Sequence, residues 1–392
     1  MKSYSPSLKA NIRIDVADIL RGIAIGGIVL IHFVEHMNFY VFPEPTAVDR
    51  AVWDTVFFLL AGKMYAIFAL LFGLSLYIQH DNQAQKGYDF RPRFVWRMIL
   101  LMIFGLLDLC FYNGDILFIY AVCGLIVLPA VRASNKLLAG IAAVLLLQPV
   151  ELAYIVMGLA DPATQPLDLG SGAHFAAMIP AQTDGSALDV AAVGIRHGLP
   201  CNFLWAIEHG RMTQTLFLFI VGILLGRRRL FYDEGGNLTI WRRILAGSIA
   251  AFAIIYPLSR TLPQDVDNVC VSHHSLDIML SMWRNFAMTA FIVSSVVIIF
   301  YRAPHGRALM AIAPYGKMSL TNYIGQSVIG GMLFYGWGFG LYRFSGHTTS
   351  LLIGAAVVVV QWMFCRWWLA HHKRGVLEEL WHRATWLCPP SR

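Results

Sequence analysis

The sequence predicts an all-α fold, an integral membrane protein that crosses the bilayer with about ten helices. Hydrophobic residues make up 57% of the chain, against about 45–50% in soluble domains. Charged residues make up 14%, well below the usual share of about a quarter. The net charge of +7 comes from basic residues in short runs between apolar stretches, which is typical of membrane-protein loops, so we expect no nucleic-acid partner.

Apolar runs long enough to cross a bilayer define the expected helices. The third and fourth are separated only by the turn-type sequence at 112–115. No other division of the chain is evident, so we expect one integral membrane domain over residues 1–392. The expected spans are 17–35, 56–79, 95–112, 115–131, 137–159, 212–226, 243–260, 279–301, 316–336 and 350–370.

Loop charge sets the expected orientation. Lys and Arg recur in every second segment between spans, and the alternate segments are mostly acidic. We therefore expect an even number of spans, both termini in the cytoplasm and a location in the cell inner membrane. The cytoplasmic segments are those around Lys9, Lys86, Arg132, Arg229, Arg307 and Lys373, and the outer ones are those around Glu44, Asp108, Asp168 and Asp267.

One predicted outer loop, residues 161–211, is long and rich in Pro, Gly, Asp and Ser. Residues 186–197 within it are compatible with a short interfacial helix. Loops of this length are usually functional or disordered, so a lid over a site and a tolerated insertion both stay open. Cys201 and Cys270 share the outer side, where a disulfide is chemically allowed; ordinary buried thiols are the alternative.

The first span carries the most informative residues, Arg21, His32, Glu35 and His36. Ionisable groups are costly in hydrocarbon and usually functional there. Arg21 and His32 are eleven positions apart, which is three helical turns plus about 20°, so they share one face roughly 16 Å apart. Imidazole titrates near neutral pH and serves as a general base or a nucleophile, which makes His32 the first catalytic candidate. The alternative is a packed interfacial histidine.

Other ionisable residues extend the candidate site. Glu35 follows His32 by three positions and is placed to fix the imidazole tautomer, as a carboxylate does in a triad. Lys63, in the second span, is a candidate catalytic clamp for the substrate or a developing oxyanion. The alternative for Lys63 is a structural ion pair with one of four carboxylates, those of Glu35, Asp54, Asp108 or Asp115. Asp115 also suits the N-terminus of the fourth helix.

Two further patterns have competing interpretations. Residues 32–36 read H-x-x-E-H, a zinc motif, but no third ligand is evident and we expect no metal. The ninth span carries polar groups on adjacent turns. We expect these groups either to line a pantetheine tunnel or to form interhelical hydrogen bonds. These polar residues are Asn322, Tyr323, Gln326 and Ser327.

Several motifs together resemble the YeiB family of bacterial membrane proteins. They are LRGIAIG at 20–26, GKM at 62–64 with LLFG at 70–73, GDIL at 114–117, GKMSLTNY at 316–323 and RWWL at 366–369. The region 230–392 resembles the domain of unknown function 418. The resemblance spans nearly the whole chain.

That family resembles in fold the transmembrane acyltransferases, including heparan-alpha-glucosaminide N-acetyltransferase and the family-3 membrane acyltransferases. The latter place an arginine and a histidine in the first helix with ten residues between them, and Arg21 and His32 match this spacing. Many YeiB-type sequences instead have an Asn-containing end to this helix. The resemblance implies acyl transfer, with acetyl as the first choice, from cytoplasmic acyl-coenzyme A. The acceptor would be a hydroxyl or amine of a small molecule, glycan or lipid at the membrane or its outer side.

Acyl-coenzyme A is thus the expected co-substrate. Arg21 is expected to hold it or to orient the site, with Asn322 and Tyr323 beside its pantetheine arm. Its phosphates are expected to meet some of five basic residues, Arg97, Arg227, Arg228, Arg229 and Lys317, although basic loops also serve simply to set topology.

A transporter or flippase of small molecules or lipids, without acyl chemistry, is the alternative function. The oligomeric state stays open, with a homodimer as one alternative, and membrane lipids are expected around the chain.

Reporter fusions test the orientation. Fusions at residues 86, 229 and 374 should report the cytoplasm, and fusions at 168 and 267 the outer side, because the Lys/Arg bias alternates along the chain. An outward C-terminus would contradict the ten-span arrangement.

Overall fold

The computed structural model describes residues 11, 13–261 and 270–387. Two positions used in the loop-charge argument, Lys9 and Asp267, lie outside these residues. All regular elements of the described residues are helical, and no β-strand occurs among them. The all-α fold class is therefore confirmed, while the side on which each terminus lies stays a prediction.

The helices range in length from five residues in α14 to 32 in α13. They are α1 (Asp15–Val34), α2 (Ala47–Leu59), α3 (Met64–Ala84), α4 (Arg91–Asp108), α5 (Leu117–Val127), α6 (Asn135–Leu146), α7 (Pro149–Ala160), α8 (Ser171–Asp184), α9 (Ala187–Val193), α10 (Leu199–Glu208), α11 (Arg211–Arg227), α12 (Asn237–Arg260), α13 (Val271–Arg302), α14 (Ala313–Lys317), α15 (Ser319–Phe334), α16 (His347–His371) and α17 (Val376–Thr385). Short 3₁₀ or π segments are η1 (Leu128–Arg132), η2 (Gly194–Gly198), η4 (Gly306–Ala311) and η5 (Leu341–Arg343).

Among the described residues, fewer helices have the length and apolarity of a membrane span than the ten expected. Five segments qualify, namely α1, α2 with α3, α12, α13 and α16, and two bent pairs raise the number to seven if each pair counts as one span. The other expected spans are helical but do not qualify. α4 carries three arginines and an aspartate in 18 residues, while α5 and α15 have only 11 and 16 residues. The chain is a multi-pass membrane protein whose apolar runs do not all form full-length helices.

The second expected span is broken near its start. α2 ends at Leu59 and α3 begins at Met64, and Gly62 between them has φ of +77°, a left-handed conformation that glycine adopts without steric cost. The break puts Lys63 at the N-terminus of α3. Irregular backbone at membrane depth is tolerated where it lines a cavity, and this segment lines one.

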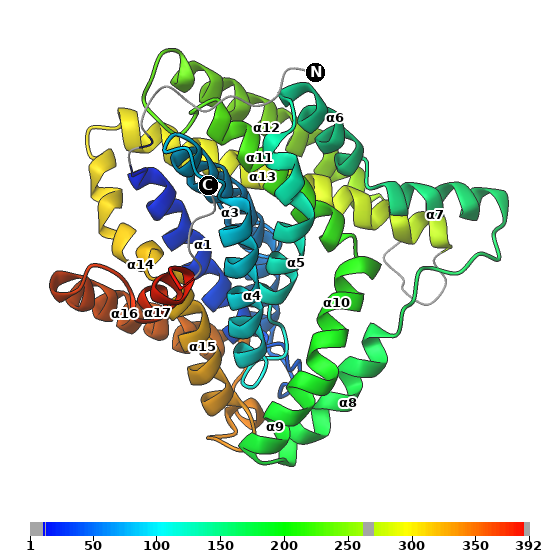
Figure 1. Cartoon of the computed structure of the whole chain (residues 1–392). Helices are drawn as coiled ribbons and strands as arrows, with labels where there is room; N and C mark the ends of the chain where they lie inside the picture. Colours follow the sequence, from blue (N-terminus) through cyan, green and yellow to red (C-terminus); the bar gives the residue numbers. More distant parts are fainter. Residues whose placement is uncertain (1–10, 12, 262–269, 388–392) are drawn as a thin grey trace.

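The first helix is enclosed by other helices (Figure 1). α1 packs against α3, α14, α15 and α16. Its apolar stretch is 72% buried inside the protein, whereas the values for α12 and α16 are 17% and 22%. α12 and α16 therefore present most of their surface outward, as lipid-facing helices do, and α1 keeps its ionisable side chains away from lipid.

The segment expected as a long loop is mostly helical. α8, α9 and α10 follow one another within 161–211 and cover one end of the bundle (Figure 1). α9 begins with a capping box, in which the Ser186 hydroxyl accepts from the Asp189 N–H and the Asp189 carboxylate accepts from the Ser186 N–H. This is the short helix expected within 186–197. Ser and Pro suggested a loop because they favour turns, but here they start helices, as Pro200 does in α10.

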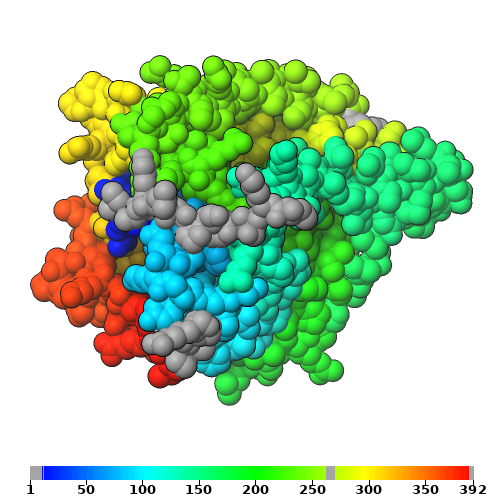
Figure 2. Space-filling view, turned by 45° about the horizontal axis from the view of Figure 1, so that its top comes forward, coloured from blue at the N-terminus to red at the C-terminus, as the bar shows by residue number. Residues whose placement is uncertain are grey.

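Residues 149–160 project from the bundle. α6 and α7 meet at a bend of 42°, where Gln148 has φ of +50°. α7 then extends outward and packs against part of α13, and Figure 2 shows this segment as a lobe beside the main body.

The described cysteines are free thiols. Cys201 is buried in α10, where its thiol donates to the Ser171 carbonyl, and Cys270 lies beside the Ser272 hydroxyl at the start of α13. The disulfide that the sequence left open is not formed.

Two glycines set the spacing between α3 and α11. A Cβ at Gly73 would overlap the carbonyl of Phe219, and a Cβ at Gly222 would overlap the carbonyl of Leu70. Small residues let membrane helices approach closely, as they do here. Because both helices begin at one cavity, their close packing also positions residues that line it.

Replacing Gly222 tests this packing. We expect Gly222→Ala to lower the free energy of unfolding by about 1–3 kcal/mol, because backbone rather than a flexible side chain must move. The matched control is Gly247→Ala in α12, where a Cβ meets nothing within 4 Å. Thermal unfolding in detergent compares the two, and equal midpoints would show that α3 and α11 have room for a methyl group.

Candidate active site

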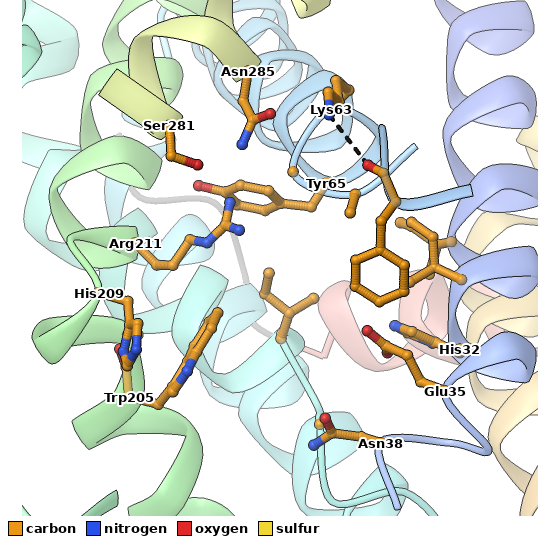
Figure 3. A pocket seen from close by; sticks show the side chains of 18 of the residues that line it. His32, Glu35, Asn38, Lys63, Tyr65, Trp205, His209, Arg211, Ser281 and Asn285 are labelled. Carbon is orange, nitrogen blue, oxygen red and sulfur yellow. Dashed lines mark hydrogen bonds between the residues drawn. The ribbon is translucent and has the colours of Figure 1, made fainter. Parts of the chain in front are cut away.

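A cavity of about 1390 Å³, here called the His32 cavity, lies between the end of α1, the α2–α3 break, α10, α11 and α13. His32 and Glu35 lie on one side of it, and Arg211 and Asn285 lie across from them (Figure 3). The helices of residues 171–208 complete the wall, since Ser171 and Trp205 are among the lining residues. The segment first expected as a loop thus contributes to the site.

His32 is half-buried against this cavity. Its Nδ1 lies 2.9 Å from the amide nitrogen of Gln326 in α15. The imidazole packs on Tyr112, with ring centroids 4.6 Å apart, and edge-on to Tyr323 at 6.4 Å. No described residue forms a hydrogen bond with Nε2, so this nitrogen is left for a ligand in the cavity.

The Gln326 amide can hold either tautomer of His32, according to which way round the amide lies. In the orientation drawn, Nε2 of Gln326 donates to Nδ1 and the Gln326 carbonyl oxygen is buried without a partner among the described residues. An amide presents oxygen and nitrogen at nearly equivalent positions, so the same contact forms with the amide turned over. Gln326 Oε1 then accepts from Nδ1–H, and the lone pair on Nε2 of His32 faces the cavity. That tautomer is the one a base or nucleophile requires.

Glu35 does not make the expected bond to His32. Its Oε1 accepts a 2.9 Å hydrogen bond from the Tyr40 hydroxyl. The expectation assumed that the helix continues, but α1 ends at Val34. Glu35 still lines the cavity beside His32 (Figure 3), so its carboxylate is close to the site without orienting the imidazole.

His36 points away from His32. Its Nδ1 lies 3.0 Å from the Val41 carbonyl and its Nε2 lies 2.7 Å from the Ser350 hydroxyl. His32, Glu35 and His36 therefore have three different partners, and the described residues contain no cluster of three metal-ligating side chains. The H-x-x-E-H pattern does not form a convergent ligand set here.

The chain after α1 is held in an uncommon backbone conformation. Four non-glycine residues have φ between +51° and +59°: His36, Met37, Asn38 and Tyr40. Each such residue costs free energy and persists only where its surroundings enforce it, commonly at functional sites. This turn brings the Tyr40 hydroxyl back to Glu35.

Lys63 has no carboxylate partner among the described residues. Its ammonium donates to the Phe57 carbonyl at 3.3 Å, and none of the four expected carboxylates pairs with it. Asp115 instead caps α5 by accepting from the N–H groups of Leu117 and Phe118, each at 3.0 Å. Capping, rather than an ion pair, is the role of Asp115.

A second cavity of about 280 Å³, here called the Arg21 cavity, gathers four of the eight residues expected to hold acyl-coenzyme A. Arg21 donates to Asp18 at 2.9 Å and to Ser75 at 2.6 Å. Arg97 donates to the Thr385 hydroxyl at 3.3 Å and stacks over Trp381 at 4.2 Å. The expected residues that line this cavity are Arg21, Arg97, Lys317 and Tyr323.

Other expected ligands lie elsewhere. Asn322 is buried and donates to the Tyr315 carbonyl and the Cys365 sulfur, so the interhelical-bond interpretation holds for it. Arg227 donates to backbone carbonyls of η1 and its flank. Arg229 pairs with Glu234 at 3.0 Å. Residues 227–229 line neither the His32 cavity nor the Arg21 cavity, so this basic run is outside both.

A thin wall separates the two cavities. In the first turn of α5, Ile116 and Ile119 line the His32 cavity, whereas Leu117 and Tyr120 line the Arg21 cavity. The ring of Tyr323 completes this wall, because it lines the Arg21 cavity and also contacts His32 edge-on. Its hydroxyl accepts from the Ile116 N–H at 3.1 Å, which fixes the ring against α5.

The C-terminal helix anchors α15, which supplies both Tyr323 and Gln326. The Glu378 carboxylate of α17 accepts from the N–H groups of Leu320 and Thr321, at 2.7 and 3.1 Å, and from the Thr321 hydroxyl at 2.6 Å. A carboxylate is favourable at a helix N-terminus. Burial raises the pKa of Glu378, an effect that these hydrogen bonds oppose.

Sequence reasoning missed several lining residues. Arg211 lines the His32 cavity but was not singled out, because it follows a mostly acidic outer segment. Arg284 and Asn285, on α13, also line the His32 cavity. Two cations near the ends of different spans were the available signal, but nothing local in the sequence showed that they converge.

Comparison with protein families matches each half of the chain to a different model. Residues 13–167 match heparan-alpha-glucosaminide N-acetyltransferase, catalytic, and residues 225–388 match the protein of unknown function DUF418. An uncharacterized protein, YeiB of Escherichia coli, is 25% identical over 94% of this chain and 95% of its own length. YxaH of Bacillus subtilis, also uncharacterized, is 26% identical over 99% of this chain and 97% of its own length. The chain is thus similar to YeiB and YxaH over nearly its whole length.

The two matched regions meet at the site. Arg21, His32 and Lys63 belong to the acyltransferase-like region, and Lys317 and Gln326 belong to the DUF418 region. The His32–Gln326 contact therefore joins the two regions, and each cavity is lined by both.

Proposed function

We propose that this protein is an acyltransferase of the cell inner membrane. It moves an acyl group, with acetyl as the first choice, from cytoplasmic acyl-coenzyme A to a hydroxyl or amine in the His32 cavity. One observation carries the proposal: a basic cavity and a histidine-lined cavity lie back to back along α1, separated by one turn of α5 and the Tyr323 ring. The match of residues 13–167 to an acetyltransferase catalytic model supports the same reaction class.

The Arg21 cavity suits the narrow part of the donor. Its volume of about 280 Å³ accommodates a pantetheine arm rather than the whole coenzyme. Lys317 lines it without a hydrogen-bond partner among the described residues, and the Arg13 side chain is 61% exposed at the same cavity. These two cations are placed to meet phosphates at the mouth, while the thioester reaches toward Tyr323.

His32 supplies the proton chemistry. With Nδ1–H donated to Gln326, Nε2 accepts the proton of the acceptor O–H or N–H as that atom bonds to the thioester carbonyl carbon. The tetrahedral intermediate collapses as the C–S bond breaks, and the coenzyme A thiolate takes the proton from the imidazolium. Acyl transfer by way of Nε2 itself, with the imidazole as carrier, uses the same tautomer.

Binding of the donor is the first test. Acetyl-coenzyme A should stabilise the purified protein more than ATP does at matched charge. At 100 times its Kd, acetyl-coenzyme A should raise the free energy of unfolding by about 2.7 kcal/mol. Arg97→Gln and Lys317→Gln should weaken this stabilisation, because both residues line the Arg21 cavity. Arg242→Gln is the control, since Arg242 is exposed at the start of α12 and lines neither cavity. No thermal shift with any acyl-coenzyme A would favour the transporter alternative.

Substitution of His32 is the second test. His32→Ala should lower acyl transfer by at least the roughly 10²–10⁴-fold that a general base contributes, with acetyl-coenzyme A binding retained. Gln326→Leu should lower the rate less, because it removes only the group that holds the tautomer. Turnover is followed as release of coenzyme A thiol. Near-normal turnover of His32→Ala would contradict the catalytic role, and an unfolded variant would support a packing role.

A further inference from the structure

Three buried or half-buried cations line the His32 cavity, besides the exposed Arg260, and none of them has an ion-pair partner among the described residues. Lys63 is only 3% exposed and donates to the Phe57 carbonyl. Arg211 donates to the Gln214 side chain at 3.2 Å, and Arg284 donates to the Ser259 hydroxyl at 3.2 Å. Both guanidinium groups act on Lys63 with the same sign of charge. All the hydrogen-bond acceptors of these cations are therefore neutral.

This arrangement differs from that of Arg21 on the same bundle. Asp18 neutralises Arg21 at 2.9 Å and also accepts from Arg13 at 2.8 Å. The two carboxylates that line the His32 cavity, Glu35 and Asp54, do not pair with its cations. Glu35 is engaged by Tyr40 across the cavity from Arg211, and Asp54 is exposed and forms no ion pair within the described residues. The cations of the His32 cavity therefore lack the carboxylate partner that Arg21 has.

A buried amide lies beside the three cations. Asn285 is 6% exposed and lines the cavity, and its carbonyl oxygen has no hydrogen-bond partner among the described residues. An unpartnered polar atom in such a place is costly unless a ligand or water satisfies it. Figure 3 shows Asn285 and Lys63 at the top of the view, Arg211 at the left, and His32 and Glu35 at the lower right.

Two helix ends add to the positive potential. α3 begins immediately after Lys63 and α11 begins at Arg211, and both first turns line the cavity. Helix N-termini carry partial positive charge and favour bound anions. The close packing of α3 and α11 through Gly73 and Gly222 keeps these two ends together.

We infer that the His32 cavity binds an acceptor that carries a phosphate or phosphodiester group, held by Lys63, Arg211 and Arg284. Arginine forms paired hydrogen bonds with phosphate oxygens, and an anion supplies the charge that the cavity lacks. The Asn285 carbonyl would accept from a hydroxyl of the same molecule. That the bound molecule is an acyl acceptor rests on the proposed function. The anion-binding site itself rests only on the residues of the cavity.

The cavity also restricts the shape of such an acceptor. His32 lies across the cavity from Arg211, so the reacting hydroxyl or amine must be separated from the phosphate by part of the molecule (Figure 3). A volume of about 1390 Å³ exceeds the roughly 300–1,000 Å³ of common ligand sites, which leaves room for a sugar or glycerol unit between the two groups. A phospholipid headgroup and a soluble phosphorylated polyol share this chemistry.

Binding measurements on the full chain distinguish these sources. The protein is placed in phosphatidylcholine nanodiscs and titrated with sn-glycerol 3-phosphate, with glycerol as the uncharged probe. A second set of nanodiscs contains spin-labelled phosphatidylglycerol. The quenching of tryptophan fluorescence that a Trp205→Phe variant loses reports lipid in the cavity, which Trp205 lines. Arg211→Gln and Arg284→Gln should weaken binding by at least about tenfold. Arg242→Gln, on an exposed position outside the cavity, should bind as the wild type does.

Each outcome decides the inference. Binding of glycerol phosphate that the cavity variants lose supports a soluble acceptor, and quenching by phosphatidylglycerol that they lose supports a lipid headgroup. Binding of neither probe, or equal binding by Arg211→Gln and Arg242→Gln, would overturn the anion site. Stabilisation by acetyl-coenzyme A is measured on the same samples. If it persists while both probes fail, the acyltransferase proposal stands and only the acceptor class is wrong.

Discussion

The cost of placing ionisable groups in hydrocarbon governs this structure. α1 carries two aspartates, an arginine and a histidine, so lipid cannot solvate its polar face and other helices must enclose it. α3, α14, α15 and α16 do so, while the apolar windows of α12 and α16 are only 17% and 22% buried. The two cavities follow from the same constraint, because each surrounds a charged or titratable group of α1 that needs polar neighbours or water.

The His32–Gln326 hydrogen bond connects the halves of the chain at the point where chemistry is proposed. Its partners are 294 positions apart and belong to regions that match different family models. A site divided in this way requires both regions to be folded and docked before the imidazole has a defined tautomer. This explains why α15 is held at its N-terminus by Glu378 as well as by packing against α1.

Periodicity and charge predicted the all-α class, the course of α1 and the separation of Arg21 from His32 along one helix. They failed where local geometry departs from an ideal helix. The Glu35–His32 bond was expected because residues three apart share a helical face, but α1 ends at Val34 and left-handed residues follow. Span counting failed for a related reason, since a hydrophobicity window does not register that α5 has 11 residues or that α2 and α3 are broken at Gly62. The cluster of Lys63, Arg211 and Arg284 comes from three distant helices, and no local pattern encodes their meeting.

The position of α17 has a practical consequence for work on this protein. Its Glu378 caps α15, its Trp381 lines the Arg21 cavity, and its Ala384 carbonyl accepts from Trp96 of α4. An amphipathic tail near the end of a membrane protein is a common place to shorten a chain for expression or crystallisation. Here, removal of residues after Gly375 would leave the α15 N–H groups uncapped and one side of the proposed donor site open to solvent. Affinity tags and fusion partners are better joined beyond residue 387, and loss of activity in a shortened chain would not by itself argue against the proposed chemistry.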